Sequence, residues 1–148
     1  MLATDFKDML TALDDAKADY LVVGAYALGA HGLVRATGDI DIWVRPTPEN
    51  AQKVWDALVA YKAPRRNLTV EDLYAEDTIY QVGLPPFRID ILTSISGVEF
   101  DSAWQRRETA ELEDDQFPIL SKEDLLANKL ASGRPKDLAD AAWLKDHQ

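Results

Sequence analysis

The stretch ATGDIDIWVRP, residues 36–46, places two carboxylates inside an otherwise apolar strand pattern. Polar and apolar residues alternate over residues 39–44, which is typical of a β-strand with one face in the core. Unpaired carboxylates are costly beside a hydrophobic core, so the second face is predicted to be an open polar surface. The alternation assigns Ile40, Ile42 and Val44 to the core face and Asp39, Asp41 and Trp43 to the polar face.

A second alternating stretch, FRIDIL at residues 87–92, supplies a third carboxylate. Its polar face carries Arg88 and Asp90, and Asp90 would lie beside Asp39 and Asp41 if the two strands are neighbours in the sheet. Three carboxylates on one open face repel one another, and a bound Mg²⁺ ion relieves that repulsion. The structural alternative is that Asp39 caps a turn and that Asp41 pairs with Arg45 or Arg88.

A strand-to-helix turn precedes the two carboxylates. Residues 20–23 form a short apolar run that predicts a buried strand, and Gly24 leads directly into an alanine-rich helical pattern over residues 25–31. Free backbone N–H groups at the positive end of such a helix suit a phosphate, and Gly24 permits close approach. Many strand-to-helix turns contain glycine, so this turn also fits a plain structural connection.

The remaining pattern predicts an α+β (α/β-like) domain with a small mixed sheet, helices on one face and further helices at the C-terminus. A length of 148 residues favours a single domain over residues 1–148. The other predicted helices cover residues 5–17, 48–59, 100–107, 122–130 and 135–144, and the other predicted strands cover residues 78–82 and one or two segments within residues 110–120.

Composition narrows the possible chemistry. The chain has no cysteine, which excludes disulfides, thiolate nucleophiles and Cys-ligated zinc. A net charge of −10 argues against general nucleic-acid binding, and an acidic enzyme needs a divalent cation to hold an anionic nucleotide. The sequence has no apolar run long enough for a membrane helix, and residues 1–20 are unlike a secretory signal, so we expect a cytoplasmic protein.

These motifs together resemble the polymerase-β-like nucleotidyltransferase superfamily. Its signature is a strand ending in glycine, a helix, an Asp-hydrophobic-Asp strand and a later third Asp. The stretch LVVGAYALGAHGLVRATGDIDIWV, residues 21–44, is similar to minimal bacterial members, including AbiEii-like toxins and small antibiotic nucleotidyltransferases. The tail LSKEDLLANKLASGRPKDLADAAWL, residues 120–144, resembles their C-terminal segment, and the resemblance extends over residues 20–144.

The resemblance implies an enzyme that moves a nucleoside monophosphate from an NTP such as ATP to a hydroxyl acceptor with the help of two Mg²⁺ ions. Asp39 and Asp41 would ligate the metal, and Asp90 would hold the second ion and help to deprotonate the attacking hydroxyl. Asp137 would orient Lys129 or Arg134. The implied nucleotide contacts are Gly24, Ala25, Arg35, Thr37 and Lys129.

One departure leaves a second function open. Ala25 stands where the family signature has a second Gly or a Ser, so the backbone N–H remains but a hydroxyl is lost. The alternative function is a catalytically idle binding module or a partner in a toxin–antitoxin pair. The acceptor (RNA, protein or small molecule) and the protein partner (an antitoxin, another protein or a second copy in a homodimer) also remain open.

Three further side chains are assigned roles outside the metal and phosphate contacts. Trp43 shares the polar face of its strand and is a candidate for stacking on a nucleobase. His31 is expected to be a plain helix-end histidine rather than a catalytic base. Arg106, in a short basic pair, is expected to be a solvated surface charge.

Overall fold

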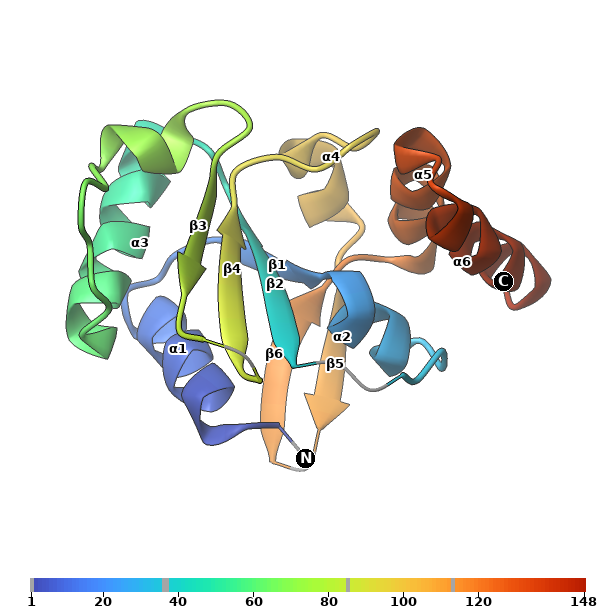
Figure 1. Cartoon of the computed structure of the whole chain (residues 1–148), viewed down its shortest axis with the longest axis horizontal. Helices are drawn as coiled ribbons and strands as arrows, with labels where there is room; N and C mark the ends of the chain where they lie inside the picture. The colour runs from blue at the N-terminus through green and yellow to red at the C-terminus, as the bar shows by residue number, and fades with distance from the viewer. Residues whose placement is uncertain (1, 36–37, 85, 113) are drawn as a thin grey trace.

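The computed structural model describes residues 2–35, 38–84, 86–112 and 114–148. It contains both helices and strands, and Figure 1 shows their arrangement. The elements are α1 (Thr4–Asp15), β1 (Tyr20–Val23), α2 (Gly24–Ala30), β2 (Asp39–Val44), α3 (Pro48–Tyr61), the 3₁₀ helix η1 (Glu71–Tyr74), β3 (Ile79–Val82), β4 (Arg88–Leu92), α4 (Phe100–Gln105), β5 (Glu108–Leu112), β6 (Asp115–Ile119), α5 (Lys122–Ser132) and α6 (Pro135–Asp146).

The strands form one mixed sheet in the order β3-β4-β2-β1-β6-β5. Strand β2 pairs with β1 in antiparallel fashion and with β4 in parallel fashion, and β6 runs parallel to β1. The predicted mixed α/β fold is therefore confirmed. Because β4 lies directly beside β2, the two strands that carry the candidate carboxylates occupy the middle of the sheet.

The apolar face of the two central strands contributes to the hydrophobic core. Ile40 and Ile42 have no solvent exposure, and Phe6 of α1 packs edge-on against Phe87, just before β4, with ring centroids 6.1 Å apart. Figure 1 shows α1 and α3 together on one side of the molecule and α5 with α6 at the opposite end. The core therefore leaves the second face of β2 and β4 for polar side chains.

Local sequence signals explain where several helices begin and end. Thr47 caps α3 by accepting a hydrogen bond from the Asn50 N–H, and Ser121 caps α5 by accepting one from Asp124. Gly133 ends α5 in the left-handed conformation with φ +68°. The helix η1 was not predicted. Within the described residues, no helix has both the length and the apolar character needed to cross a bilayer.

Candidate active site

The carboxylates of the two central strands come together as their spacing predicted. In the parallel register of β2 and β4, Asp41 lies opposite Asp90, and Asp39 lies opposite Arg88. The Arg88 guanidinium reaches both strands, with Nη2 3.0 Å from Asp39 Oδ2 and Nε 3.0 Å from Asp90 Oδ1. Asp90 is only 8% exposed, so its negative charge depends on this neighbour. The arginine pairing considered for Asp41 is instead made by Asp39 and Asp90.

Asp41 has the most perturbed environment of the three carboxylates. Its pKa is raised to about 6, chiefly by burial and then by the charges of Asp90 and Asp39, against the opposing effect of Arg88. Carboxylates that share one small site resist simultaneous ionisation in this way. The positive charge of Arg88 therefore does not fully compensate the negative charge of the three carboxylates, and an additional cation would stabilise them.

Gly24 lies directly against this acidic group. Its φ is +68°, and a Cβ atom added there would come within 2.3 Å of Asp41 Oδ2. A side chain at this position would be strained and would also collide with the carboxylate. The structure therefore places Gly24 against Asp41, while the predicted approach of a phosphate to this turn stays a prediction.

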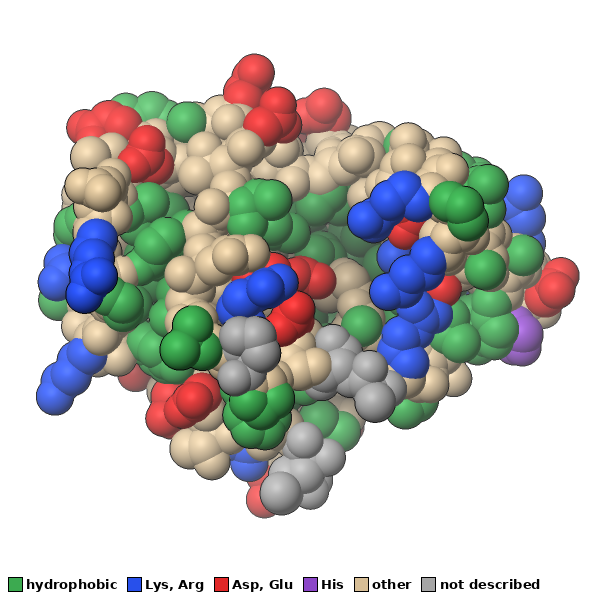
Figure 2. Space-filling model, viewed as in Figure 1, with side chains coloured by type: hydrophobic (Ala, Val, Ile, Leu, Met, Phe, Trp, Pro, Cys, Tyr) green, Lys and Arg blue, Asp and Glu red, His purple; other side chains and the backbone are tan. Residues whose placement is uncertain are grey.

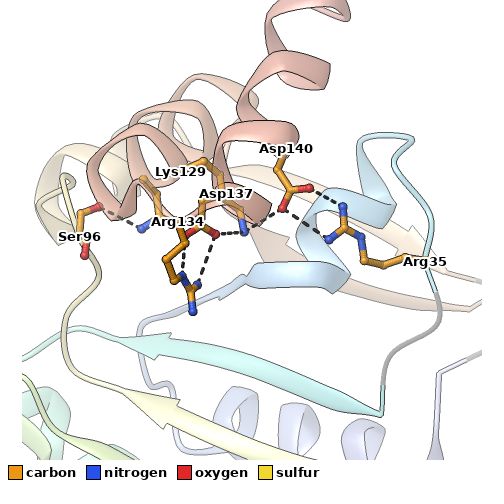
Figure 3. A network of polar contacts seen from close by, with 7 residues as sticks. Arg35, Ser96, Lys129, Arg134, Asp137 and Asp140 are labelled. Carbon is orange, nitrogen blue, oxygen red and sulfur yellow. Dashed lines mark hydrogen bonds and ion pairs between the residues drawn. The ribbon is translucent and has the colours of Figure 1, made fainter.

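A second polar cluster joins α5 and α6 to Arg35, in the loop that follows α2, as Figure 3 shows. Lys129 Nζ lies 3.4 Å from Asp137 and 3.2 Å from Asp140. Arg35 Nη2 contacts Asp140 at 2.5 Å, and Arg134 Nε contacts Asp137 at 2.7 Å. We call these five residues the cation cluster. The predicted contacts of Asp137 with Lys129 and Arg134 are both present.

Two buried carboxylates hold the cation cluster together. Asp137 is 1% exposed and Asp140 is 3% exposed. The hydrogen bond from Arg134 lowers the pKa of Asp137, and Lys129 adds to the effect. Burial acts to raise the pKa of Asp140, but hydrogen bonds from Arg35 and Lys129 outweigh it and hold the pKa below its ordinary value. Both carboxylates are therefore ionised at neutral pH and fix the positions of the cations.

Acidic and basic side chains lie on the same face of the molecule. Figure 2 shows carboxylates beside a basic side chain near the centre of this face and a group of Lys and Arg side chains toward the C-terminal helices, with recessed surface between them. Such a face can accept a ligand that carries several negative charges together with a metal cation.

The carboxylates of Asp39, Asp41 and Asp90 are suitable ligands for a hard divalent cation, but their present arrangement is not that of a metal site. Three carboxylates offer oxygen donors, which Mg²⁺ prefers, and the raised pKa of Asp41 reflects first its burial and then the neighbouring charges of Asp90 and Asp39. Among the described residues, however, no group of three or more His, Cys, Asp or Glu side chains has the geometry of a metal site. The Arg88 guanidinium lies between Asp39 and Asp90, so a bound metal would require this side chain to move.

One sequence prediction about an individual side chain is wrong, and another is incomplete. Trp43 is 1% exposed and packs edge-on against Phe100 of α4 with ring centroids 5.0 Å apart, so its face cannot stack on a base. Arg106 is exposed, as predicted, and its guanidinium also pairs with the buried carboxylate of Asp124 at 2.7 Å. Thr37 lies outside the described residues.

Other positions agree with the predictions or extend them. His31 Nε2 lies 2.8 Å from the backbone oxygen of Leu120, which is the structural role expected of it. Asp140 was missed as a member of the site. Its only sequence signal is its position three residues after Asp137, which puts both carboxylates on one side of α6.

Comparison with known proteins decides the family. Residues 1–144 match the model of a family described as nucleotidyltransferase of unknown function, DUF6036. The chain belongs to this family. The expected resemblance to nucleotidyltransferases is therefore confirmed. No curated protein sequence significantly matches this DUF6036 protein.

Two solved structures share the fold of this DUF6036 protein. One is TM1012 of Thermotoga maritima, described as a nucleotidyltransferase, with 15% identity and a TM-score of 0.60 over 95% of this chain and 88% of the other. The second is the lincosamide antibiotic adenylyltransferase LnuA in its lincomycin-bound form, with 16% identity and a TM-score of 0.57 over 100% and 99% of the two chains. At these identities the likeness shows the fold.

Proposed function

We propose that this DUF6036 protein is a Mg²⁺-dependent enzyme that transfers a nucleoside monophosphate from an NTP such as ATP to a hydroxyl acceptor. The observation that carries the proposal is the parallel register that sets Asp41 opposite Asp90, with Asp39 two residues away on the same strand. Family membership makes nucleotidyl transfer the reaction class that this acidic group would serve.

Asp39, Asp41 and Asp90 are the proposed ligands of two Mg²⁺ ions. The ions, when bound, would supply positive charge that stabilises the attacking and leaving oxygens. Asp41 and Asp90 are adjacent across β2 and β4, which would let both carboxylates contact one cation. Arg88 is the cation that lies among these carboxylates in the structure, and it would have to give up its contacts.

The cation cluster is the proposed triphosphate site. Lys129 and Arg134 carry positive charge on α5 and at the start of α6, and the buried Asp137 fixes both of them. Arg35 is fixed by Asp140 in the same way. Pre-positioned cations lose little entropy when phosphate oxygens bind. The backbone N–H groups of Gly24 and Ala25 would contribute at the other end, beside Asp41, and a role for Thr37 remains a prediction.

The proposed reaction is an in-line displacement at the α-phosphorus. The acceptor oxygen forms a bond to phosphorus while the bond to the bridging oxygen of the β-phosphate breaks, and pyrophosphate leaves. We assign the acceptance of the hydroxyl proton to Asp90, as the resemblance to nucleotidyltransferases implies, and its position opposite Asp41 supports this assignment. Lys129 would hold the departing pyrophosphate.

A transfer assay tests this proposal. The protein is incubated with each α-labelled NTP in turn, with Mg²⁺ and with a cell extract as the source of acceptors. We expect label to appear on one class of acceptor, and we expect Asp41→Asn to abolish that label. Absence of transfer with all four NTPs, or equal transfer by the variant, would contradict the proposal.

A catalytically idle binding module is the second candidate. Arg88 occupies the space between two of the three carboxylates, and Ala25 lacks the hydroxyl of the family pattern, which together favour this alternative. Its partner would be a protein, such as an antitoxin or a second copy of the chain. Thermal unfolding with Mg²⁺ and ATP separates the candidates, because a working site gains about 3 kcal/mol at 100 times the dissociation constant, whereas an idle one gains nothing.

A further inference from the structure

The two edges of the sheet differ in charge. Strands β3 and β5 end the sheet on opposite sides, as Figure 1 shows. The β5 edge carries two exposed glutamates, Glu108 and Glu111, and exposed charges on an edge strand discourage pairing with another chain. Strand β3 (Ile79–Val82) has no charged side chain. The β3 edge therefore lacks the protection that the β5 edge has.

The backbone groups of alternate β3 residues point away from the sheet. The Thr93 N–H donates to the backbone oxygen of Thr78 at 3.0 Å, which makes Thr78, just before β3, a hydrogen-bonded position of the β3–β4 pair. Bonded and non-bonded positions alternate along an antiparallel strand, so Ile79 and Gln81 direct their N–H and C=O groups outward. Within the described residues, no other segment hydrogen bonds to these groups.

Large apolar side chains are exposed along the same edge. Ile79 is 63% exposed, and Leu84, in the turn after β3, is 82% exposed. Unpaired backbone groups beside exposed apolar side chains favour the addition of a further β-strand. The β3 edge therefore suits another strand rather than a small molecule.

A second copy of β3 matches this edge in one register. When two β3 strands pair in antiparallel fashion about a two-fold axis at Gln81, the outward groups of the two Gln81 residues face each other. In the same register, the outward groups of Ile79 face Gly83 of the second copy. Every outward position of the strand therefore meets another outward position.

The same register keeps the acidic residues of the two copies apart. Asp77 lies two residues before β3, and its carboxylate is exposed. In the antiparallel pairing the two Asp77 residues are eight residue steps apart, which is about 27 Å along the strands. A parallel pairing would place them side by side, so the antiparallel arrangement is the one that an acidic protein tolerates.

Leu84 enlarges the contact beyond the strand pair. A stable interface buries roughly 800 Å² on each partner, more than a strand as short as β3 supplies. Because Gly83 lies opposite Ile79 of the second copy, Leu84 lies beside that exposed isoleucine. The pairing therefore removes apolar surface of both copies from water, which favours association.

The β3 edge borders the candidate active site. Gln81 lies opposite Asp90 across β3 and β4, so both side chains are on the polar face of the sheet. A second copy would add its own β3 to this face, two strand spacings, or about 10 Å, from Asp90. Its Gln81 would therefore extend the polar face that carries the acidic group.

We propose that the protein forms a symmetric dimer in which the β3 strands of two copies pair in antiparallel fashion and join their sheets. A second copy is favoured over an unrelated strand, because it brings Leu84 to each exposed Ile79 and keeps the Asp77 carboxylates apart. The inference does not depend on the proposed reaction.

Sedimentation velocity measures the association directly. We expect the wild type to be a dimer at high micromolar concentration. Ile79→Lys is expected to raise the dimer dissociation constant roughly tenfold or more, because each copy loses an apolar contact and gains an edge charge. Thr109→Lys is the matched change on the β5 edge and is expected to leave the dissociation constant unchanged. Both positions are exposed, so both variants are expected to fold normally.

Cysteine cross-linking tests the register. The chain has no cysteine, so a single introduced thiol reports only on its own position. In the proposed pairing the two Cα atoms at position 81 are about 5.5 Å apart, which suits a disulfide. We expect Gln81→Cys to form a disulfide-linked dimer under mild oxidation roughly tenfold or more faster than Thr109→Cys, because pairing raises the effective thiol concentration.

Several results would overturn the inference. These are a monomeric wild type at high micromolar concentration, unchanged association of Ile79→Lys, or equal cross-linking rates of the two cysteine variants. Dissociation caused by Thr109→Lys alone would assign the interface to β5 and would also overturn it. None of these measurements uses nucleotide or metal, so their failure leaves the proposed function to be decided by the transfer assay.

Discussion

Arg88 Nη2 lies 3.0 Å from Asp39 Oδ2, so a side chain of β4 bridges to the neighbouring strand at the middle of the acidic group. The same guanidinium contacts Asp90 with Nε at 3.0 Å. These contacts lower the repulsion among the carboxylates without a metal. They also put one positive charge where the proposed Mg²⁺ ions would bind, so arginine and metal should compete.

Replacing Arg88 with Met is expected to increase the affinity for Mn²⁺ about tenfold, because the variant loses a competing cation from a partly exposed site. Mn²⁺ binding is measured by electron paramagnetic resonance in the absence of nucleotide. Arg45→Met is the matched control, since Arg45 pairs with Asp19 and Asp101 away from the acidic group. Unchanged or weaker binding by the Arg88 variant would mean that this arginine orients the carboxylates rather than competing with a metal.

Gly24→Ala is expected to destabilise the protein by about 2 kcal/mol or more. The positive φ disfavours any side chain, and the new methyl group would collide with Asp41 Oδ2. Gly29→Ala is the matched control on the same helix, because nothing lies within 4 Å of its added Cβ. That change is expected to stabilise α2 by about 0.5–1 kcal/mol. Urea denaturation measures both, and equal effects would contradict the close packing at Gly24.

Asp41→Asn is expected to stabilise the metal-free protein above pH 6. Folding raises the Asp41 pKa from its ordinary value of 3.8 to about 6, so its protonated form favours the folded state at low pH. This contribution is lost as pH rises through about 6, at a cost of up to about 3 kcal/mol. Denaturation experiments from pH 4 to 8 should therefore show that the free energy of unfolding of the variant increases relative to that of the wild type as the pH rises. Parallel curves would show that Asp41 is not strained by its neighbours.

Lys129→Met is expected to cost about 3 kcal/mol of stability at pH 7, because it leaves the buried Asp137 and Asp140 with one fewer cation. The pKa values of both carboxylates are lowered, so the stability they contribute is present at neutral pH and is lost as pH falls. The variant should lose less stability on acidification than the wild type. Lys136→Met, an exposed change on α6, should alter stability by less than about 0.5 kcal/mol.

The central part of the site follows from sequence because strand alternation is a local property. The pattern at Asp39 and Asp41 assigned both to one face, and the pattern at Asp90 did the same for β4. The prediction that Asp90 lies beside Asp41 required β2 and β4 to be neighbours. The sequence does not show which strands are neighbours, because strand pairing depends on the whole sheet. The structure shows that β2 and β4 are paired and that their register sets Asp41 opposite Asp90.

The errors and omissions concern contacts between distant segments. Alternation placed Trp43 on the polar face, but it carried no information about α4, whose Phe100 covers that ring. Arg106 is an exposed charge as predicted, but its pairing with Asp124 was missed because that carboxylate is buried and lies on another helix. Asp140 was missed because its role depends on Arg35, which reaches it from beyond the end of α2. None of these pairings leaves a periodic signal in sequence.

The most direct test of the central claim is Mn²⁺ binding in the presence of a non-hydrolysable ATP analogue, measured by electron paramagnetic resonance. The wild type is compared with Asp41→Asn and Asp90→Asn, and with Asp56→Asn as an exposed control on α3. We predict saturable binding by the wild type and the control, and its loss in both site variants. Equal binding by all four proteins would contradict the assignment of these carboxylates as the metal site.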